Sequence, residues 1–248
     1  MFEGILNPVF NPLLALPIQW VVLIMAFIIT LIITLIYRFT TNQSLMKQLK
    51  GEMKELQTEM KELKSEPKKM MEVQKKAMQT NMKYMSHSMR STLFTFIPII
   101  LIFGWMTGHL AYNPILPGQD FTTTVSLYDG INGNAYIIVP EGIKLVSEIN
   151  RTIDNTQLKW VLNGKEGSYI LEYNIAGNTY TKDITITKEQ NYAAPIKPVK
   201  DKIVKQINID NQKMIVFNLL GWKLGWLGSY IILSIIFSMT LRKLFKVY

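Results

Sequence analysis

The chain has 248 residues, 48% of them hydrophobic, and carries 27 Lys and Arg against 18 Asp and Glu, a formal net charge of +9 at pH 7. Its apolar residues are concentrated in long runs, which excludes a single soluble globular domain and predicts a membrane protein. The absence of cysteine excludes disulfides and thiolate metal sites.

The chain begins with an apolar segment containing three prolines, residues 1–17, which we expect to form a short interfacial segment outside the cell. Residues 18–37 then contain no charged residue. At about 1.5 Å per residue, this run can cross a hydrocarbon core of about 30 Å. Because no Lys or Arg precedes it and no small-residue cleavage pattern follows it, we predict a retained transmembrane helix rather than a cleaved signal peptide.

Residues 38–90 form a basic, methionine-rich segment. Methionine and leucine recur at spacings of three and four from Met46 to Leu63, the pattern of a coiled-coil helix. Pro67 interrupts this helix because proline lacks a backbone N–H donor. A second helical arm follows, so we predict a helical, coiled-coil hairpin with antiparallel arms. One face of the second arm carries Met71, Met78, Met82, Met85 and Met89.

This methionine face has two possible interpretations. The methionine side chain is flexible and polarizable, which suits a surface that accepts varied apolar partners and favours a role in substrate capture. Alternatively, the methionines fill the seam between the hairpin's own two arms. The spacing alone does not choose between them.

Two further apolar runs match the length of a membrane-crossing helix, residues 93–112 and residues 224–241. Residues 113–220, between them, have short alternating runs separated by turn residues such as Asn132-Gly133 and Asn163-Gly164. This pattern predicts an inserted all-β, sandwich-like domain, with one or two further strands within 203–220. The expected strands are residues 121–127, 135–139, 144–149, 157–162, 168–175 and 179–187.

The distribution of basic residues predicts the orientation. Residues 38–90 contain twelve Lys and Arg against six acidic residues, and the tail, residues 242–248, adds three more with no acidic residue. The positive-inside rule therefore places the hairpin and the C-terminus in the cytoplasm and the N-terminus outside. Residues 113–220 then lie outside, and we expect a multi-pass protein of the plasma membrane.

Each predicted span also carries a row of polar residues in its cytoplasmic half. Serine and threonine in membrane helices commonly bond their own backbone or a neighbouring helix, and an arginine at a helix end can simply snorkel to the interface. Three rows at the same depth instead favour a shared polar recess open to the cytoplasm. The rows are Thr30, Thr34 and Arg38, then Ser91 and Thr95, then Ser234 and Ser238.

Sequence motifs of catalysis are absent: the chain has no zinc-protease, phosphate-binding or nucleophile-elbow motif. Its two histidines, His87 and His109, are predicted on opposite sides of the membrane, and neither has a ligand-like companion. We therefore expect no enzyme, no cofactor and no metal. Asn150-Arg151-Thr152 is a candidate glycosylation sequon on the outer side, whereas Asn42-Gln43-Ser44 lies on the inner side, where it should not be used.

Several of these segments resemble the archaeal YidC-like family, part of the YidC/Oxa/Alb superfamily of membrane insertases that also includes a subunit of the ER membrane protein complex. The resemblance covers residues 17–113 and 221–248. It rests on the run from Lys68 to Met78, on Asn81 to Met85, on Phe96-Ile97-Pro98 through Phe103-Gly104-Trp105, and on Gly225 to Gly228 with Leu241 to Leu244.

The resemblance implies a three-span insertase with a hydrophilic groove facing the cytoplasm and a mobile hairpin that captures incoming apolar segments. It matches Arg38 to the positively charged position at the mouth of the groove. Two core spans of bacterial YidC have no counterpart here, and the outer β domain has none in the core family.

The expected partners are nascent membrane proteins, the ribosome through the basic hairpin, the lipid bilayer and the Sec translocon, but not DNA. Two other functions remain open from the residues alone. One is a membrane anchor that displays the outer β domain, although an anchor would need neither the methionines nor the aligned polar rows. The other is a small ion pathway, although a channel should also have polar residues in the outer leaflet.

Overall fold

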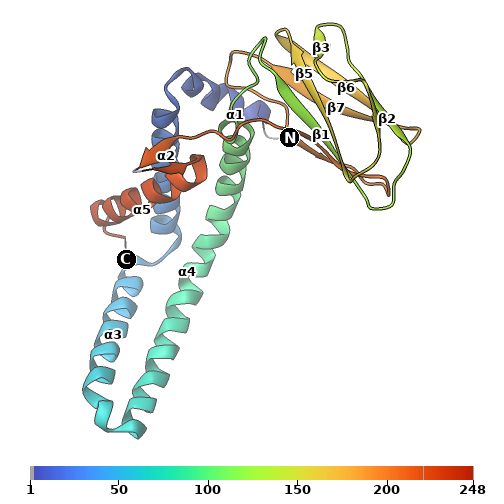
Figure 1. The fold of residues 1–248 in the computed structure, drawn as a ribbon. Helices are drawn as coiled ribbons and strands as arrows, with labels where there is room; N and C mark the ends of the chain where they lie inside the picture. The colour runs from blue at the N-terminus through green and yellow to red at the C-terminus, as the bar shows by residue number, and fades with distance from the viewer. Residues whose placement is uncertain (1–2, 220, 248) are drawn as a thin grey trace. The chain divides into compact units, whose positions relative to one another are not determined.

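A computed structural model describes residues 3–219 and 221–247 (Figure 1). The chain divides into two compact units, Met1–Gly104 with Leu219–Tyr248, and Trp105–Asn218. The first unit is mainly helical, and the second is all-β apart from the end of one long helix.

The helical unit begins with α1 (Glu3–Phe10) and a 3-10 turn, η1 (Asn11–Ala15). Neither is long enough to cross a membrane. Three later helices are long and apolar enough to do so: α2 (Ile18–Thr40), α4 (Pro67–Leu110) and α5 (Trp226–Leu244). The described residues therefore contain three candidate spans.

The second hairpin arm and the second span form one continuous helix. We expected them as separate segments, residues 38–90 and 93–112, but α4 runs unbroken through 44 residues. Ser91-Thr92 at the expected boundary contains no helix-breaking residue. A change from polar to apolar surroundings does not in itself interrupt the backbone hydrogen bonds of a helix.

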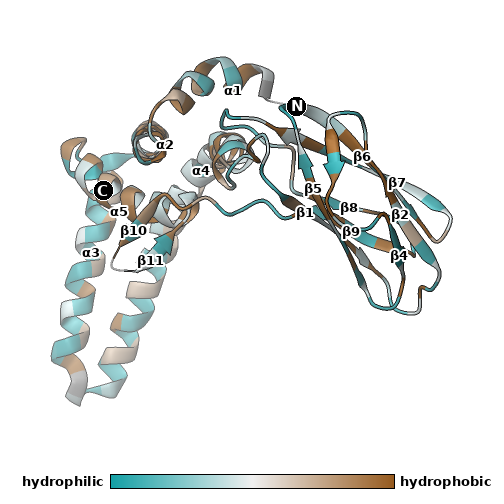
Figure 2. Cartoon of the chain, turned by 45° about the horizontal axis from the view of Figure 1, so that its top comes forward, coloured by the Kyte–Doolittle hydropathy of each residue, from teal (hydrophilic) through white to brown (hydrophobic). Residues whose placement is uncertain are grey.

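The first arm of the hairpin is α3 (Gln43–Glu62). Asn42 caps it, since its Oδ1 accepts a hydrogen bond from the Leu45 backbone N–H at 3.1 Å. A short turn, η2 (Leu63–Ser65), leads to Pro67, which begins α4 at the position where a missing N–H costs least. The two arms lie side by side in Figure 1, and in Figure 2 α3 is mainly teal whereas α2 is mainly brown.

The β unit contains two antiparallel sheets. A five-stranded sheet has the order β3-β5-β1-β9-β8, and a four-stranded sheet has the order β4-β2-β6-β7. Near the start of α5, β10 (Phe217–Leu219) and β11 (Trp222–Leu224) form a separate two-stranded sheet. The bounds of the others are β1 Phe121–Leu127, β2 Asn134–Ile138, β3 Ile143–Leu145, β4 Asn150–Thr152, β5 Gln157–Gly164, β6 Gly167–Ile175, β7 Asn178–Ile186, β8 Ile196–Pro198 and β9 Val204–Ile209.

The two sheets share one core. Trp160 on β5 and Tyr173 on β6 are both fully buried, and their rings lie 5.8 Å apart between centroids. Tyr173 also shares a 2.6 Å hydrogen bond with Thr123 on β1, so a polar bond as well as apolar packing joins the sheets. The alternation of buried and exposed residues along strands such as β2 and β5 contributes to this shared core.

One expected turn is part of a strand. We expected Asn163-Gly164 to turn the chain, but β5 continues through Gly164. A Cβ atom at Gly164 would lie 2.5 Å from the side-chain Cδ1 atoms of both Ile143 and Ile186. The glycine therefore permits close packing within the core, and the chain turns at Lys165 and Glu166 instead.

Candidate functional site

The methionines of α4 lie outside the seam of the hairpin. The seam is formed by buried residues of α3, such as Leu49 and Leu56, and on α4 by Val73 and Thr80. Thr80 donates a 2.9 Å hydrogen bond to Glu52 across the seam. The methionine face is 60–68% exposed at each of its members, which are Met71, Met78, Met82, Met85 and Met89.

This apolar face continues into the predicted span. Leu93, Phe96, Ile97 and Ile100 are 55–68% exposed on the same helix. Because α4 is unbroken from Pro67, the methionines and these aliphatic and aromatic side chains form one surface that leads from the hairpin into the apolar part of the helix. An apolar segment bound to the methionines therefore has a continuous apolar path along α4.

A recess of about 320 Å³ lies between α2 and α5. The two helices pack along each other in the same direction. The rings of Phe27 and Phe237 make an edge-to-face contact, with 5.5 Å between their centroids. Four of the predicted polar residues meet at this recess, and Arg242 lines it as well. The complete lining is Thr30, Ile33, Thr34, Tyr230, Ser234, Ile235, Ser238, Met239 and Arg242.

Three hydroxyl groups of the recess donate hydrogen bonds to carbonyl oxygens of their own helices. Thr30 Oγ1 donates to the Ala26 carbonyl at 2.6 Å, Thr34 Oγ1 donates to the Thr30 carbonyl at 2.7 Å, and Ser234 Oγ donates to the Ile231 carbonyl at 2.9 Å. Each hydroxyl oxygen retains acceptor capacity. The recess can therefore accept hydrogen bonds from water or from an N–H group, while the two threonines, 4% and 3% exposed, form its floor.

The arginine at the recess is Arg242. Its guanidinium carbon lies 5.4 Å from the centroid of the Tyr37 ring, at the C-terminal end of α2. Arg38 was expected to face the recess, but it does not line it, and its guanidinium carbon lies 5.8 Å from the ring of Phe245. A cation over an aromatic face is attracted by the ring quadrupole, which accounts for the position of both side chains.

The two polar residues predicted on α4 lie outside the recess between α2 and α5. Ser91 and Thr95 are buried, 1% and 7% exposed, and neither lines the recess. They lie on the face of α4 that also carries Tyr84, whose hydroxyl is 3.4 Å from that of Tyr37 on α2. Within the part of the chain that the structure describes, Ser91 Oγ is a buried polar atom without a hydrogen-bond partner.

Two polar residues of the recess were missed from the sequence, Tyr230 and Arg242. Both follow the spacing already present in Ser234 and Ser238, since the four residues lie at consecutive intervals of four on α5. The four-residue spacing of Ser234 and Ser238 could therefore have predicted both residues. Extending it by one step in each direction would have found both residues.

The structure shows no metal-binding constellation among residues 3–219 and 221–247. The recess and the methionine face together offer apolar surface, hydrogen-bond acceptors and one cation. This chemistry can hold an extended or helical polypeptide with a polar end.

Residues 3–136, more than half of the chain, match the family described as "Integral membrane protein EMC3/TMCO1-like". The match includes α2, the hairpin, all of α4 and the start of the β unit, whereas α5 lies outside it. No curated protein and no solved structure matches the chain.

Proposed function

The chain belongs to the EMC3/TMCO1-like family of integral membrane proteins, and on this premise we propose that it is a membrane protein insertase. The family is part of the insertase-related superfamily that includes YidC, Oxa and Alb proteins. In our proposal, the methionine face of α4 captures an apolar segment of a nascent membrane protein. The recess between α2 and α5 then lowers the barrier for moving the polar flank of that segment into the bilayer.

The recess is the observation that carries this proposal. A substrate helix gains free energy when its apolar residues leave water, but each unsatisfied polar group moved through hydrocarbon costs several kcal/mol. Hydroxyl oxygens at Thr34, Ser234 and Ser238 supply acceptors between two helices whose sequences are otherwise apolar. Arg242 adds a positive charge that attracts acidic substrate ends and holds water.

We further propose that the protein lies in the plasma membrane. In the proposed orientation, the hairpin and the C-terminus face the cytoplasm. The excess of basic residues in the hairpin and the tail supports this orientation. The same charge favours contact with ribosomal RNA, and we include the Sec translocon as a further partner. From the resemblance of the segments quoted in the sequence analysis, we propose that the protein is an archaeal YidC-like form. We also propose that it has no catalytic activity and no cofactor.

The proposal can be tested by reconstituting the full chain in proteoliposomes and measuring insertion of a short-tailed membrane substrate. Replacing both Thr34 and Ser238 with leucine should remove acceptors from the recess and reduce insertion by about tenfold, equal to about 1.4 kcal/mol in the barrier. Leucine is stable in a membrane helix, so the fold should survive. Thr240→Leu is the matched control, because Thr240 lies on α5 outside the recess.

Unchanged insertion by a folded Thr34→Leu/Ser238→Leu variant would contradict the insertase proposal. It would favour the alternative in which the chain anchors the β unit to the membrane. Equal losses in this variant and in Thr240→Leu would show that general helix packing, rather than the recess, limits the reaction.

A further inference from the structure

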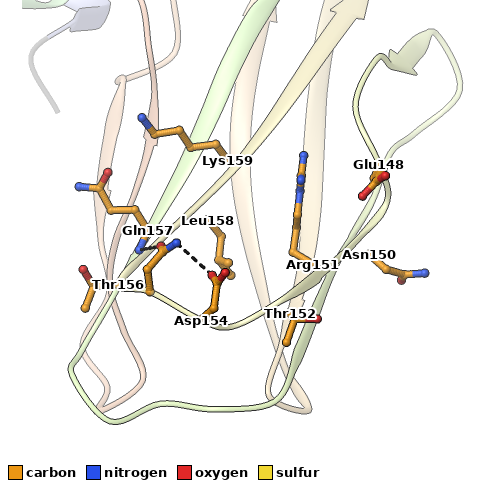
Figure 3. A pocket seen from close by; sticks show the side chains of 10 residues that line it. Glu148, Asn150, Arg151, Thr152, Asp154, Thr156, Gln157, Leu158 and Lys159 are labelled. Atoms are coloured by element: carbon orange, nitrogen blue, oxygen red, sulfur yellow. Dashed lines mark hydrogen bonds between the residues drawn. The ribbon is translucent and has the colours of Figure 1, made fainter.

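The sequon Asn150-Arg151-Thr152 coincides with β4, an edge strand of the four-stranded sheet. Successive side chains of a strand point to opposite faces, so Asn150 and Thr152 share one face and Arg151 takes the other. Both Asn150 and Thr152 are exposed, and Arg151 is half-buried. Figure 3 shows Asn150 and Arg151 pointing in different directions from the strand.

The outer face of this sheet offers a surface for a sugar beside Asn150. Tyr136 on β2 is the direct cross-strand partner of Asn150, and it is 38% exposed. Residues paired in this way have Cβ atoms about 4.5–5.5 Å apart. Ile138, two residues further along the same face of β2, is 48% exposed. A tyrosine ring combines an apolar face with a polar edge, which suits contact with a sugar ring.

We propose that Asn150 carries an N-linked glycan whose first sugar packs against Tyr136. In the modification, the Asn150 side-chain nitrogen forms a bond to C1 of the first sugar. The bond from that carbon to the phosphate oxygen of a lipid-linked oligosaccharide donor breaks, the lipid phosphate leaves with the electron pair, and the nitrogen loses one proton. This inference rests on the outward placement of the β unit in the proposed function.

The chain has one other sequon, Asn42-Gln43-Ser44, and its asparagine is already engaged. Asn42 Oδ1 accepts a hydrogen bond from the Leu45 backbone N–H at 3.1 Å, which caps α3, and a second one from Ser44 Oγ at 2.6 Å. The proposed orientation also places it in the cytoplasm. Asn42 is therefore a control within the same chain.

The test is expression of the full chain in a host that N-glycosylates its secreted proteins, followed by mass measurement before and after treatment with an N-glycosidase. The wild-type chain should lose the mass of one glycan. Asn150→Gln and Thr152→Val should show no such loss, whereas Thr152→Ser and Asn42→Gln should behave like the wild type. Glycan removal should also lower the unfolding temperature of the wild type but not that of Tyr136→Ser.

A wild-type chain without a glycan, or a glycan that persists in Asn150→Gln, would overturn the proposal. Equal changes in unfolding temperature for the wild type and Tyr136→Ser would overturn the sugar contact. Labelling of Asn132→Cys by an impermeant reagent in sealed cells separates the two proposals, since Asn132 is exposed in the β unit. If Asn132→Cys is labelled but Asn150 is unmodified, only the glycan fails; if Asn132→Cys is not labelled, the orientation fails with it.

Discussion

Arg38 and Arg242 lie at the same end of two packed helices but have different surroundings. Arg242 lines the recess, whereas Arg38 lies over Phe245. We therefore expect Arg242→Gln to reduce insertion of substrates with acidic ends by about tenfold, and Arg38→Gln by less than about twofold, in the proteoliposome assay. Both variants remove one positive charge, so their difference isolates the recess.

Arg242→Lys provides a second comparison, because it keeps the charge and should retain most of the activity towards acidic ends. Substrates with neutral ends should respond less to all three variants. If Arg38→Gln reduced insertion more than Arg242→Gln, Arg38 rather than Arg242 would be the residue that attracts acidic substrate ends. The substrate path would then lie outside the recess.

At the residue scale, helical spacing predicted four of the recess residues but not the positions of long side chains. Spacing identifies a face, whereas an arginine side chain can reach across several residues to an aromatic ring. Lys182 on β7 is a similar case. Alternation with Ile184 and Ile186 places it on the buried face, but the sequence does not show that Nζ donates to the carbonyls of Asp183 and Ala194, each at 2.7 Å. Burial lowers the pKa of Lys182.

At the element scale, the exposed methionines make a prediction about capture. A photo-crosslinker at Met78 or Met82 should form adducts with the apolar segment of a ribosome-bound nascent membrane protein, because both positions are exposed. A crosslinker at Leu56, which is buried in the seam, should instead react with the other arm. The measurement is the size of each adduct on a gel, with a nascent soluble protein as the negative control.

If a crosslinker at Met78 formed adducts only between the two arms of the hairpin, the result would contradict capture of apolar segments by the methionine face. Equal yields with soluble and membrane nascent chains would show contact without selectivity for apolar segments.

Hydrophobic periodicity predicted the three spans, both hairpin arms and most of the strands. The boundaries were less predictable where one residue type serves two purposes. Gly164 after asparagine has the composition of a turn, but its lack of a side chain accommodates Ile143 and Ile186 in the core. The three-residue strand β4 was missed because a strand this short contains too few alternations to detect.

At the scale of the whole molecule, the β unit should be dispensable for insertion. Its two connections meet, since the Asn113 N–H donates to the Gln212 carbonyl at 2.8 Å and the Met214 N–H donates to the Ala111 carbonyl at 3.0 Å. Replacing residues 114–211 with a short glycine-rich linker should therefore preserve this junction. A smaller deletion that retains β9 would leave that strand without its partner β1 and expose core residues.

We expect this deletion to insert the short-tailed substrate within about twofold of the full chain, a change of less than about 0.5 kcal/mol in the barrier. Retained membrane integration of the deletion variant is the required control. Lost insertion in a well-folded deletion variant, together with normal activity of the recess variants, would favour the anchor.

The continuity of α4 has a mechanical consequence. Its 44 residues measure roughly 66 Å at 1.5 Å per residue, about twice the thickness of a hydrocarbon core. A single stiff rod of this length transmits a tilt or a torque applied at one end to the other. Pro98 is its most compliant point, because it cannot donate the usual hydrogen bond to the Phe94 carbonyl. If the hairpin binds substrate as proposed, the bound segment would also exert leverage on the span, and bending at Pro98 would determine how much of that motion reaches Leu110.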